Sequence, residues 1–217
     1  MTFVRDCRII NAFGLDSGKG ESLVHHLYYL MGKSASGKDT VYKRLLERFP
    51  ALKPLVLHTT RPQRDKEQNG REYFFISEPE LAVMREADML IEERTYHTKK
   101  GDWTYCTAKN SIDLSAGSYL GIGTPESYVK IRDYFGGEKV IPIYITVEDG
   151  VRLQRALDRE RKQTAPNYAE LCRRFLSDAQ DFSEEKLAAA GIETRFENIE
   201  LEACISEIAA QITASGV

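Results

Sequence analysis

Residues 23–49, LVHHLYYLMGKSASGKDTVYKRLLERF, decide the fold of this 217-residue chain. The apolar run over residues 23–31 has the length and composition of a buried strand. A loop that contains glycines follows, and after it apolar residues from Val41 to Phe49 repeat at helical spacing. A strand, a glycine loop and a helix in this order open a fold in which parallel strands alternate with helices.

The loop between this strand and this helix, Gly32 to Lys38, fits the pattern G-x-x-x-x-G-K of phosphate-binding loops. Its glycines let successive backbone N–H groups converge on phosphate oxygens, the helix N-terminus adds its positive end, and Lys38 supplies a mobile ammonium group. The pattern therefore predicts a site for a nucleoside triphosphate. The residues expected to hold it are Gly32, Ser34, Ala35, Ser36, Gly37, Lys38, Asp39 and Thr40.

The residue after the loop lysine departs from the usual pattern. This position normally holds Ser or Thr, whose hydroxyl binds Mg²⁺, but here it is Asp39, followed by Thr40. A carboxylate is also a good hard-oxygen ligand for Mg²⁺. Asp39 is therefore a candidate metal ligand, and its negative charge near the phosphates is unfavourable unless the metal lies between them.

The rest of the chain continues the alternation of strands and helices. Apolar runs predict strands over residues 54–58, 73–76, 89–96, 120–122, 139–147 and 193–199. Helices are expected over residues 77–87, from residue 125 onward, and over 151–163, 168–182 and 199–212. The segment 97–107 is polar and holds the only tryptophan. The predicted fold class is α/β, with a parallel sheet core flanked by helices.

Composition and charge exclude several classes of protein. The net charge of −3 argues against a general nucleic-acid binder, whose affinity comes from a basic surface. No stretch approaches the roughly 18 apolar residues that a membrane span needs, and the N-terminal segment has no long apolar core. The four cysteines are far apart, which suggests free thiols in a reducing compartment. We therefore expect a cytoplasmic protein that binds neither membranes nor nucleic acid.

A second constellation of functional residues spans residues 58–75, HTTRPQRDKEQNGREYFF. Arg61 and Arg64, three positions apart, can present forked donors to one dianionic phosphate, and the Tyr73 hydroxyl can add another. Here the sequence resembles guanylate kinases, whose nucleotide-acceptor segment has the pattern T-T-R-x-x-R-x-x-E-x-x-G-x-x-Y-x-F. Every fixed position is filled, by Thr59, Thr60, Arg61, Arg64, Glu67, Gly70, Tyr73 and Phe75. The resemblance implies that Arg61, Arg64 and Tyr73 hold the phosphate of an acceptor GMP.

The same resemblance extends to the residues around the acceptor base. Glu92 in LIEER matches the family's glutamate, whose carboxylate accepts hydrogen bonds from guanine, and Thr107 in Tyr105-Cys106-Thr107 matches a hydroxyl that helps to recognise the base. The family's D-I-D pair is missing, because the corresponding stretch reads Leu120-Gly121-Ile122-Gly123. Strict guanine specificity is therefore open, and we hypothesise that Asp39 restores one negative charge near the metal.

The charged helices near the C-terminus resemble the family's lid. Cations on a closing lid neutralise charge on the phosphoryl group in transfer. Arg159 and Arg161 are both candidates in the first lid helix, because the match leaves the register uncertain by one or two residues, and Arg174 is the candidate in the second. The resemblance also implies that Asn198 corresponds to a polar group beside adenine. The expected organisation is an N-terminal appendage (1–22) and a guanylate-kinase-like domain (23–214). Within that domain we expect an acceptor-binding lobe at about 58–107 and a lid at about 155–174.

Together these features imply the P-loop nucleoside-monophosphate kinase fold, with a small acceptor-binding lobe and a helical lid. The implied reaction transfers the γ-phosphoryl group of ATP to GMP or dGMP, with Mg²⁺ as cofactor and Lys38, Arg159, Arg161 and Arg174 as catalytic residues. A related kinase with another nucleotide acceptor and a non-catalytic guanylate-kinase-like binding module are the alternatives. The sequence carries no prediction of an oligomeric state.

Overall fold

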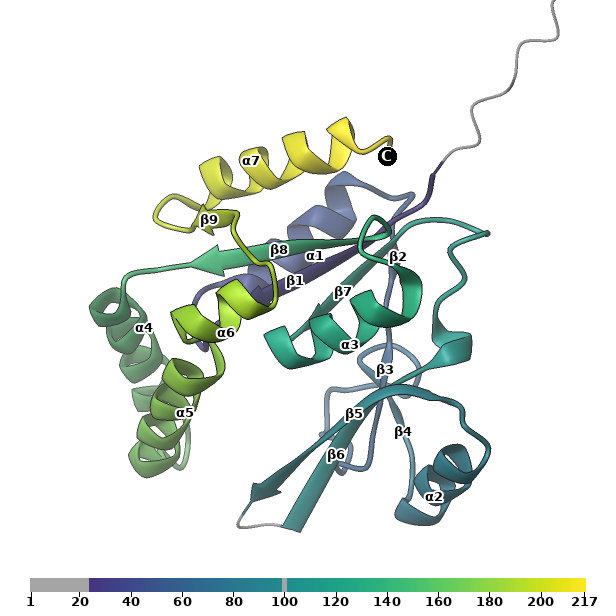
Figure 1. The fold of residues 1–217 in the computed structure, drawn as a ribbon. Coiled ribbons are helices and arrows are strands. Elements are labelled where there is room, and N and C mark those ends of the chain that lie inside the picture. The colour runs from purple at the N-terminus through teal and green to yellow at the C-terminus, as the bar shows by residue number, and fades with distance from the viewer. Residues whose placement is uncertain (1–23, 99–100) are drawn as a thin grey trace, which may run out of the picture.

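A computed structural model describes residues 24–98 and 101–217, so the expected N-terminal appendage, residues 1–22, lies outside the described residues. The chain is built on two sheets (Figure 1). The larger sheet is parallel throughout. Its strands, in spatial order, are β2 (Lys53–Pro54), β7 (Tyr119–Gly123), β1 (Leu27–Gly32), β8 (Val140–Thr146) and β9 (Arg195–Glu197). The predicted α/β fold with a parallel core is confirmed.

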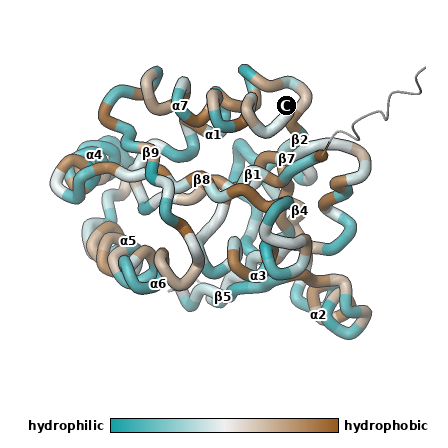
Figure 2. The backbone as a smooth tube through the Cα atoms, turned by 45° about the horizontal axis from the view of Figure 1, so that its top comes forward, coloured by the Kyte–Doolittle hydropathy of each residue, from teal (hydrophilic) through white to brown (hydrophobic). Residues whose placement is uncertain are grey.

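The larger sheet has a hydrophobic core on each of its two faces. Its central strand, β1, is buried along its whole length. Side chains alternate along β1, so that Tyr28 and Leu30 face one layer of helices while Tyr29 and Met31 face the other. Figure 2 shows hydrophobic stretches along β1 and β8, enclosed between the helices. The first layer consists of α1 (Lys38–Arg48) and α7 (Leu201–Ala214), and the second of α3 (Pro125–Phe135) and α6 (Glu184–Ala189).

The smaller sheet is mixed and lies beside the larger one (Figure 1). Its strands, in spatial order, are β4 (Tyr73–Phe75), β3 (Leu57–Thr59), β6 (Gly101–Ala108) and β5 (Leu90–Thr98). β3 runs parallel to β4, whereas β6 is antiparallel to both β3 and β5. The helix α2 (Glu78–Glu86) begins at a capping box formed by Ser77 and Glu80, as the sequence predicts.

The structure corrects one strand prediction and adds a strand that was not predicted. The single strand expected over residues 54–58 is wrong: β2 pairs with β7 in the larger sheet, while β3 pairs with β4 and β6 in the smaller one. Leu55 and Leu57 are both buried, which produces a continuous apolar run although the chain changes sheets. The segment 97–107, described from the sequence only as polar, contains most of β6. A short 3-10 helix, Lys109–Ser111, follows it.

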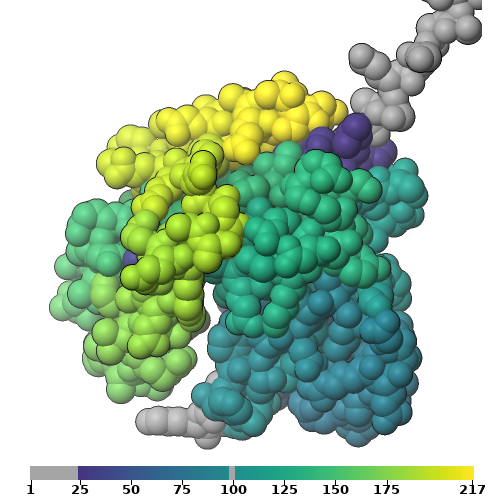
Figure 3. All heavy atoms as spheres, viewed as in Figure 1, coloured from purple at the N-terminus to yellow at the C-terminus, as the bar shows by residue number. Residues whose placement is uncertain are grey.

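The charged region near the C-terminus forms two helices, α4 (Asp149–Arg161) and α5 (Tyr168–Asp181), which pack against each other. The Glu148 side chain caps the first by accepting hydrogen bonds from the N–H groups of Gly150 and Val151. Figure 3 shows a deep notch between this helical pair and the smaller sheet.

Two further expectations concern the environment of the protein. Over residues 24–98 and 101–217, no helix is long and apolar enough to cross a membrane. Cys106, Cys172 and Cys204 carry free thiols, as expected, and Cys7 lies outside the described residues.

Candidate functional site

The phosphate-loop motif forms a tight turn between the end of β1 and the start of α1. Ala35 and Gly37 have left-handed backbones, with φ of 63° and 85°. Residues of this conformation, placed among right-handed ones, turn successive N–H groups towards one side, which produces an anion-binding concavity. Gly37 is required for a second reason, because a Cβ atom there would collide with the side-chain amide of Asn198.

Three polar side chains from other elements hold this loop in place. The Asn198 amide donates a hydrogen bond of 2.8 Å to the Ser36 carbonyl. The guanidinium of Arg152 donates one of 3.0 Å to the Ser34 carbonyl, and the Asp178 carboxylate accepts one of 2.7 Å from the Ser34 N–H. The loop is therefore tied to Asn198, the residue after β9, and to the helices α4 and α5.

Arg152 was not predicted from the sequence. Its side chain is 1% exposed, pairs with Asp149 and Asp178, and lies 4.3 Å over the Phe175 ring. Arg152 and Ala156 are the buried residues of α4 and lie four positions apart, on one face of the helix. One sequence signal could have identified Arg152: an arginine four residues before Ala156, at a position where the helical spacing expects an apolar residue.

A cleft of about 820 Å³ lies between the phosphate loop, the smaller sheet and α5. It joins residues predicted from separate motifs. The predicted residues that line it are Gly32, Ser34, Lys38 and Asp39 from the phosphate loop, Arg64 and Tyr73 from the acceptor segment, and Arg174 from the lid. The Lys38 ammonium lies 4.0 Å from the Asp39 carboxylate. The notch in Figure 3 marks the mouth of this cleft.

Asp39 meets the requirements of a magnesium ligand. Its side chain is 75% exposed and lines the cleft, so the carboxylate is open to a cation. Among the residues that the structure describes, no three or more His, Cys, Asp or Glu side chains gather as a metal cage. Mg²⁺ is commonly held by one or two carboxylates together with substrate phosphates and water. A single carboxylate beside a phosphate loop fits that mode of binding.

The two arginines of the acceptor segment have different surroundings. The Arg61 guanidinium is buried, donates to both Glu67 carboxylate oxygens at 2.8 and 3.0 Å, and bonds to the Pro62 carbonyl. Arg64 lines the cleft, while its backbone N–H donates to Glu67 at 2.9 Å. Burial acts to raise the pKa of Glu67, but the hydrogen bonds from Arg61 and Arg64 outweigh it and lower that pKa. Arg61 thus orders the segment, and its contact with a phosphate stays a prediction.

Glu92 and Thr107 are brought together by the pairing of β5 with β6. The Thr107 hydroxyl donates a hydrogen bond of 2.7 Å to one Glu92 oxygen, and Arg94 donates one of 2.9 Å to the other. The Glu92 side chain is 1% exposed and that of Arg94 11%, and of these residues only Arg94 lines the cleft. Sequence reasoning missed Arg94, although period-two alternation along a strand places it on the face of Glu92.

The glycines that replace the expected aspartates face Tyr29. In the register of β1 and β7, Tyr29 lies opposite Gly121. A Cβ atom on residue 121 would lie 2.9 Å from the Tyr29 ring, and one on Gly123 would overlap the Tyr29 hydroxyl. That hydroxyl shares a hydrogen bond of 2.8 Å with Ser127, and burial raises the pKa of Tyr29 to about 12. The space beside both glycines is therefore filled by an aromatic side chain.

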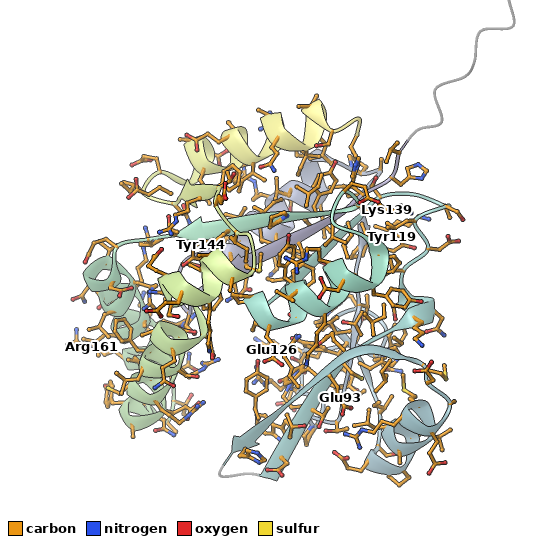
Figure 4. All side chains as sticks on the ribbon, in the orientation of Figure 1. Glu93, Tyr119, Glu126, Lys139, Tyr144 and Arg161 are labelled. Carbon is orange, nitrogen blue, oxygen red and sulfur yellow. The ribbon has the colours of Figure 1, made fainter. Side chains whose placement is uncertain are left out.

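The lid arginines separate into two groups. Arg159 and Arg174 line a small cavity of about 40 Å³ between α4 and α5, which Ser34 of the phosphate loop also lines. Arg161 instead pairs with Asp158 at 3.6 Å, with its side chain 60% exposed. Figure 4 shows it on the side of α4 that faces away from the smaller sheet. The geometry favours Arg159 over Arg161 as the arginine of the first lid helix.

Comparison with known proteins finds guanylate kinases among the relatives of this chain. A family profile described as guanylate kinase matches residues 25–118. A guanylate kinase of Cupriavidus metallidurans is 30% identical over 165 residues, which cover 73% of this chain and 70% of that protein. A guanylate kinase of Polaromonas sp. is 36% identical over 88 residues, or 41% of each chain. With this relative and several others, the aligned part spans about two fifths of the relative's length.

The fold comparison covers more of the chain. The crystal structure of a guanylate kinase from Anaplasma phagocytophilum aligns with a TM-score of 0.64 and 19% sequence identity. The alignment covers 90% of this chain and 88% of that one. It therefore supports a shared fold along nearly the whole chain.

Proposed function

The chain belongs to the guanylate kinase family, and on this premise we propose that it transfers the γ-phosphoryl group of ATP to GMP or dGMP, giving ADP and a nucleoside diphosphate. One observation carries the proposal: the phosphate loop and the acceptor segment meet in one cleft. Lys38 and Asp39 line it from the loop, and Arg64 and Tyr73 line it from the smaller sheet. Phosphoryl transfer requires a donor phosphate and an acceptor aligned at such a junction.

In this proposal the phosphate loop holds the triphosphate of ATP. The left-handed backbone at Ala35 and Gly37 directs N–H groups to the phosphates, and Lys38 adds a positive charge. Asp39 would hold Mg²⁺, which, when bound with ATP, neutralises charge on the phosphate oxygens. Asn198 braces the loop from behind, and we retain it as the candidate polar group beside adenine.

The acceptor lies on the opposite wall of the cleft. Arg64 and the Tyr73 hydroxyl bind its phosphate, and the base extends towards Arg94. Glu92 and Thr107 lie behind Arg94, outside the lining of the cleft. We keep Arg61 as a second phosphate ligand, because a guanidinium has five N–H donors and its bonds to Glu67 and Pro62 do not use all of them.

The lid supplies charge and excludes water during transfer. Arg159 and Arg174, together with Lys38, stabilise the negative charge on the equatorial oxygens of the moving phosphoryl group. Arg161 is the alternative to Arg159. The three described free thiols suit a reducing compartment, and we place the reaction in the cytoplasm.

An assay that couples ADP release to a chromogenic reaction tests the proposal with GMP, dGMP, AMP, CMP and UMP as acceptors. GMP or dGMP should give the highest kcat/KM. Lys38→Met should lower kcat by about 100-fold or more, since it removes charge stabilisation at the phosphoryl group. Lys43→Met, at an exposed lysine of the same helix, is the matched control. Turnover with a different nucleotide alone would point to the alternative acceptor, and turnover with none would favour a binding module.

A further inference from the structure

We propose that Arg94 recognises the acceptor base, by donating two hydrogen bonds to the O6 and N7 edge of guanine. The inference rests on the proposed function, since it assigns the base contact within the same cleft. It departs from the expectation that Glu92 recognises guanine through the N1–H and 2-amino groups.

The first step concerns Glu92, whose carboxylate is already engaged. One oxygen accepts from Thr107 at 2.7 Å and the other from Arg94 at 2.9 Å. Its side chain is 1% exposed and does not line the cleft. A carboxylate can accept further hydrogen bonds, but the donors of guanine would reach this one only if the side chains that cover it moved. Glu92 therefore acts as the partner that fixes Arg94.

The second step concerns the donors that Arg94 has left. A guanidinium carries five N–H donors and no acceptor. Glu92 takes one of them, and the hydroxyl groups of Tyr29 and Tyr96 neighbour the same guanidinium. A pair of N–H groups remains for a ligand in the cleft that Arg94 lines. Burial alone would lower the pKa of Arg94, but Tyr29 and Glu92 more than offset it and raise that pKa.

The third step concerns the surface on which the base would lie. Tyr96, Trp103 and Tyr105, from the β5–β6 hairpin, line the cleft together with Arg94. The Tyr96 and Tyr105 rings meet edge to face with centroids 5.7 Å apart. Aromatic side chains offer stacking surfaces for any base, so they supply affinity without selectivity. Selectivity among the bases must therefore come from the guanidinium group of Arg94 beside these rings.

The chemistry of Arg94 selects among the bases. A guanidinium binds guanine by donating to O6 and N7 at once, the most frequent specific contact between arginine and a base. Adenine presents its 6-amino donor at that position and is repelled. In this arrangement the 2-amino group of guanine is not contacted, because Glu92 is buried and does not line the cleft. Hypoxanthine, which has O6 and N7 but no 2-amino group, should therefore be accepted as well as guanine.

The wild-type protein provides the first test, with GMP, IMP, AMP and 7-deaza-GMP as probes. Turnover gives KM, and fluorescence of Trp103, the only tryptophan, gives binding without turnover. IMP should match GMP within about threefold, and 7-deaza-GMP, which lacks the N7 acceptor, should bind about tenfold more weakly or worse. AMP should bind at least as weakly as 7-deaza-GMP. A larger difference between IMP and GMP, or equal binding of 7-deaza-GMP and GMP, would overturn the inference.

A variant provides the second test. Arg94→Lys keeps a positive charge beside Glu92 but loses the forked donors. It should raise KM for GMP and IMP by about tenfold each while kcat stays within about threefold. Arg85→Lys, at an exposed arginine of α2 that pairs with Glu93, is the matched control, and Figure 4 shows Glu93 on β5. An unchanged KM in a folded Arg94→Lys protein contradicts the role of Arg94.

The two proposals fail in distinguishable ways. If no nucleotide is turned over but Trp103 fluorescence shows that GMP and IMP bind alike and 7-deaza-GMP binds more weakly, the kinase function fails and the role of Arg94 stands. If GMP is turned over but IMP is rejected, the kinase function stands and Arg94 does not recognise the base. Should Arg94→Lys fail to fold, the comparison of nucleotides with the wild-type protein decides alone.

Discussion

The hydroxyl of Tyr29 fills the position that a Cβ atom on residue 123 would occupy. The same hydroxyl shares a 2.8 Å hydrogen bond with Ser127 of α3. The absence of aspartates at 121 and 123 is therefore not a simple loss of two carboxylates. Tyr29, on the neighbouring strand, occupies the space beside both glycines, and Arg94 is one of its charged neighbours.

This relationship predicts that an aspartate cannot simply be restored. Gly123→Asp should lower the free energy of unfolding by about 1–3 kcal/mol, because it overpacks a site closed by Tyr29 and Ser127. Urea denaturation measures the change. Gly137→Asp, at a glycine with no heavy atom within 4 Å of a built Cβ, should stay within about 0.5 kcal/mol of wild type. Equal stability of the two variants would show that residue 123 has room for a side chain.

A second prediction concerns the buried link between the lid and the phosphate loop. Arg152→Met should lower the free energy of unfolding by about 1.5–3 kcal/mol, because it removes a buried guanidinium that pairs with Asp149 and with the half-buried Asp178. It should also raise KM for ATP, since the Ser34 carbonyl loses its brace. Thermal and urea unfolding measure the stability, and Arg161→Met, which breaks an exposed pair, is the control. Similar losses in both variants would contradict the role given to Arg152.

A third prediction concerns magnesium. Asp39→Ala should raise the Mg²⁺ concentration for half-maximal activity by about tenfold, because a charged oxygen ligand is lost. Asp39→Ser should recover part of that loss, since a hydroxyl is the usual ligand at this position. Glu47→Ala, at an exposed carboxylate of the same helix, serves as the control. A Mg²⁺ dependence that is unchanged in Asp39→Ala would remove Asp39 from the metal site.

A fourth prediction concerns acid stability of the acceptor segment. Despite burial, which acts to raise it, the folded-state pKa of Glu67 lies below the ordinary glutamate value of 4.5, because Arg61 and the Arg64 N–H donate hydrogen bonds to its carboxylate. The stabilisation from its pair with Arg61 is thus complete above pH 4.5 and declines as the pH falls through the folded-state pKa. Glu67→Gln should therefore be less stable than wild type near neutral pH, and the difference should shrink below pH 4.5. Urea midpoints across that range measure it, and a gap that does not change with pH would contradict the assignment.

Several parts of the fold were predictable because their signals are local. The run that ends at Met31, the glycine loop and the periodic residues of α1 identified the opening unit, and KVIPIYITV identified β8. β6 was missed because Asp102, Thr104 and Thr107 make its sequence polar. The helix α6 was missed because it is short and follows α5 closely, although Ser183 caps it.

The residues of the candidate site also fall into those with a local sequence signal and those placed by contacts between distant elements. By itself, the sequence determined the phosphate loop, Asp39, and the acceptor segment with Arg64 and Tyr73, because spacing within a short segment sets which groups a loop can present. Only the tertiary structure decided that Glu92 is held by Arg94, that Arg152 braces Ser34, and that Tyr29 fills the space beside Gly123. These contacts join residues from different strands and helices, and their formation depends on register and packing across elements. Burial then makes each contact strong, since a buried charge or hydroxyl without a partner is unfavourable.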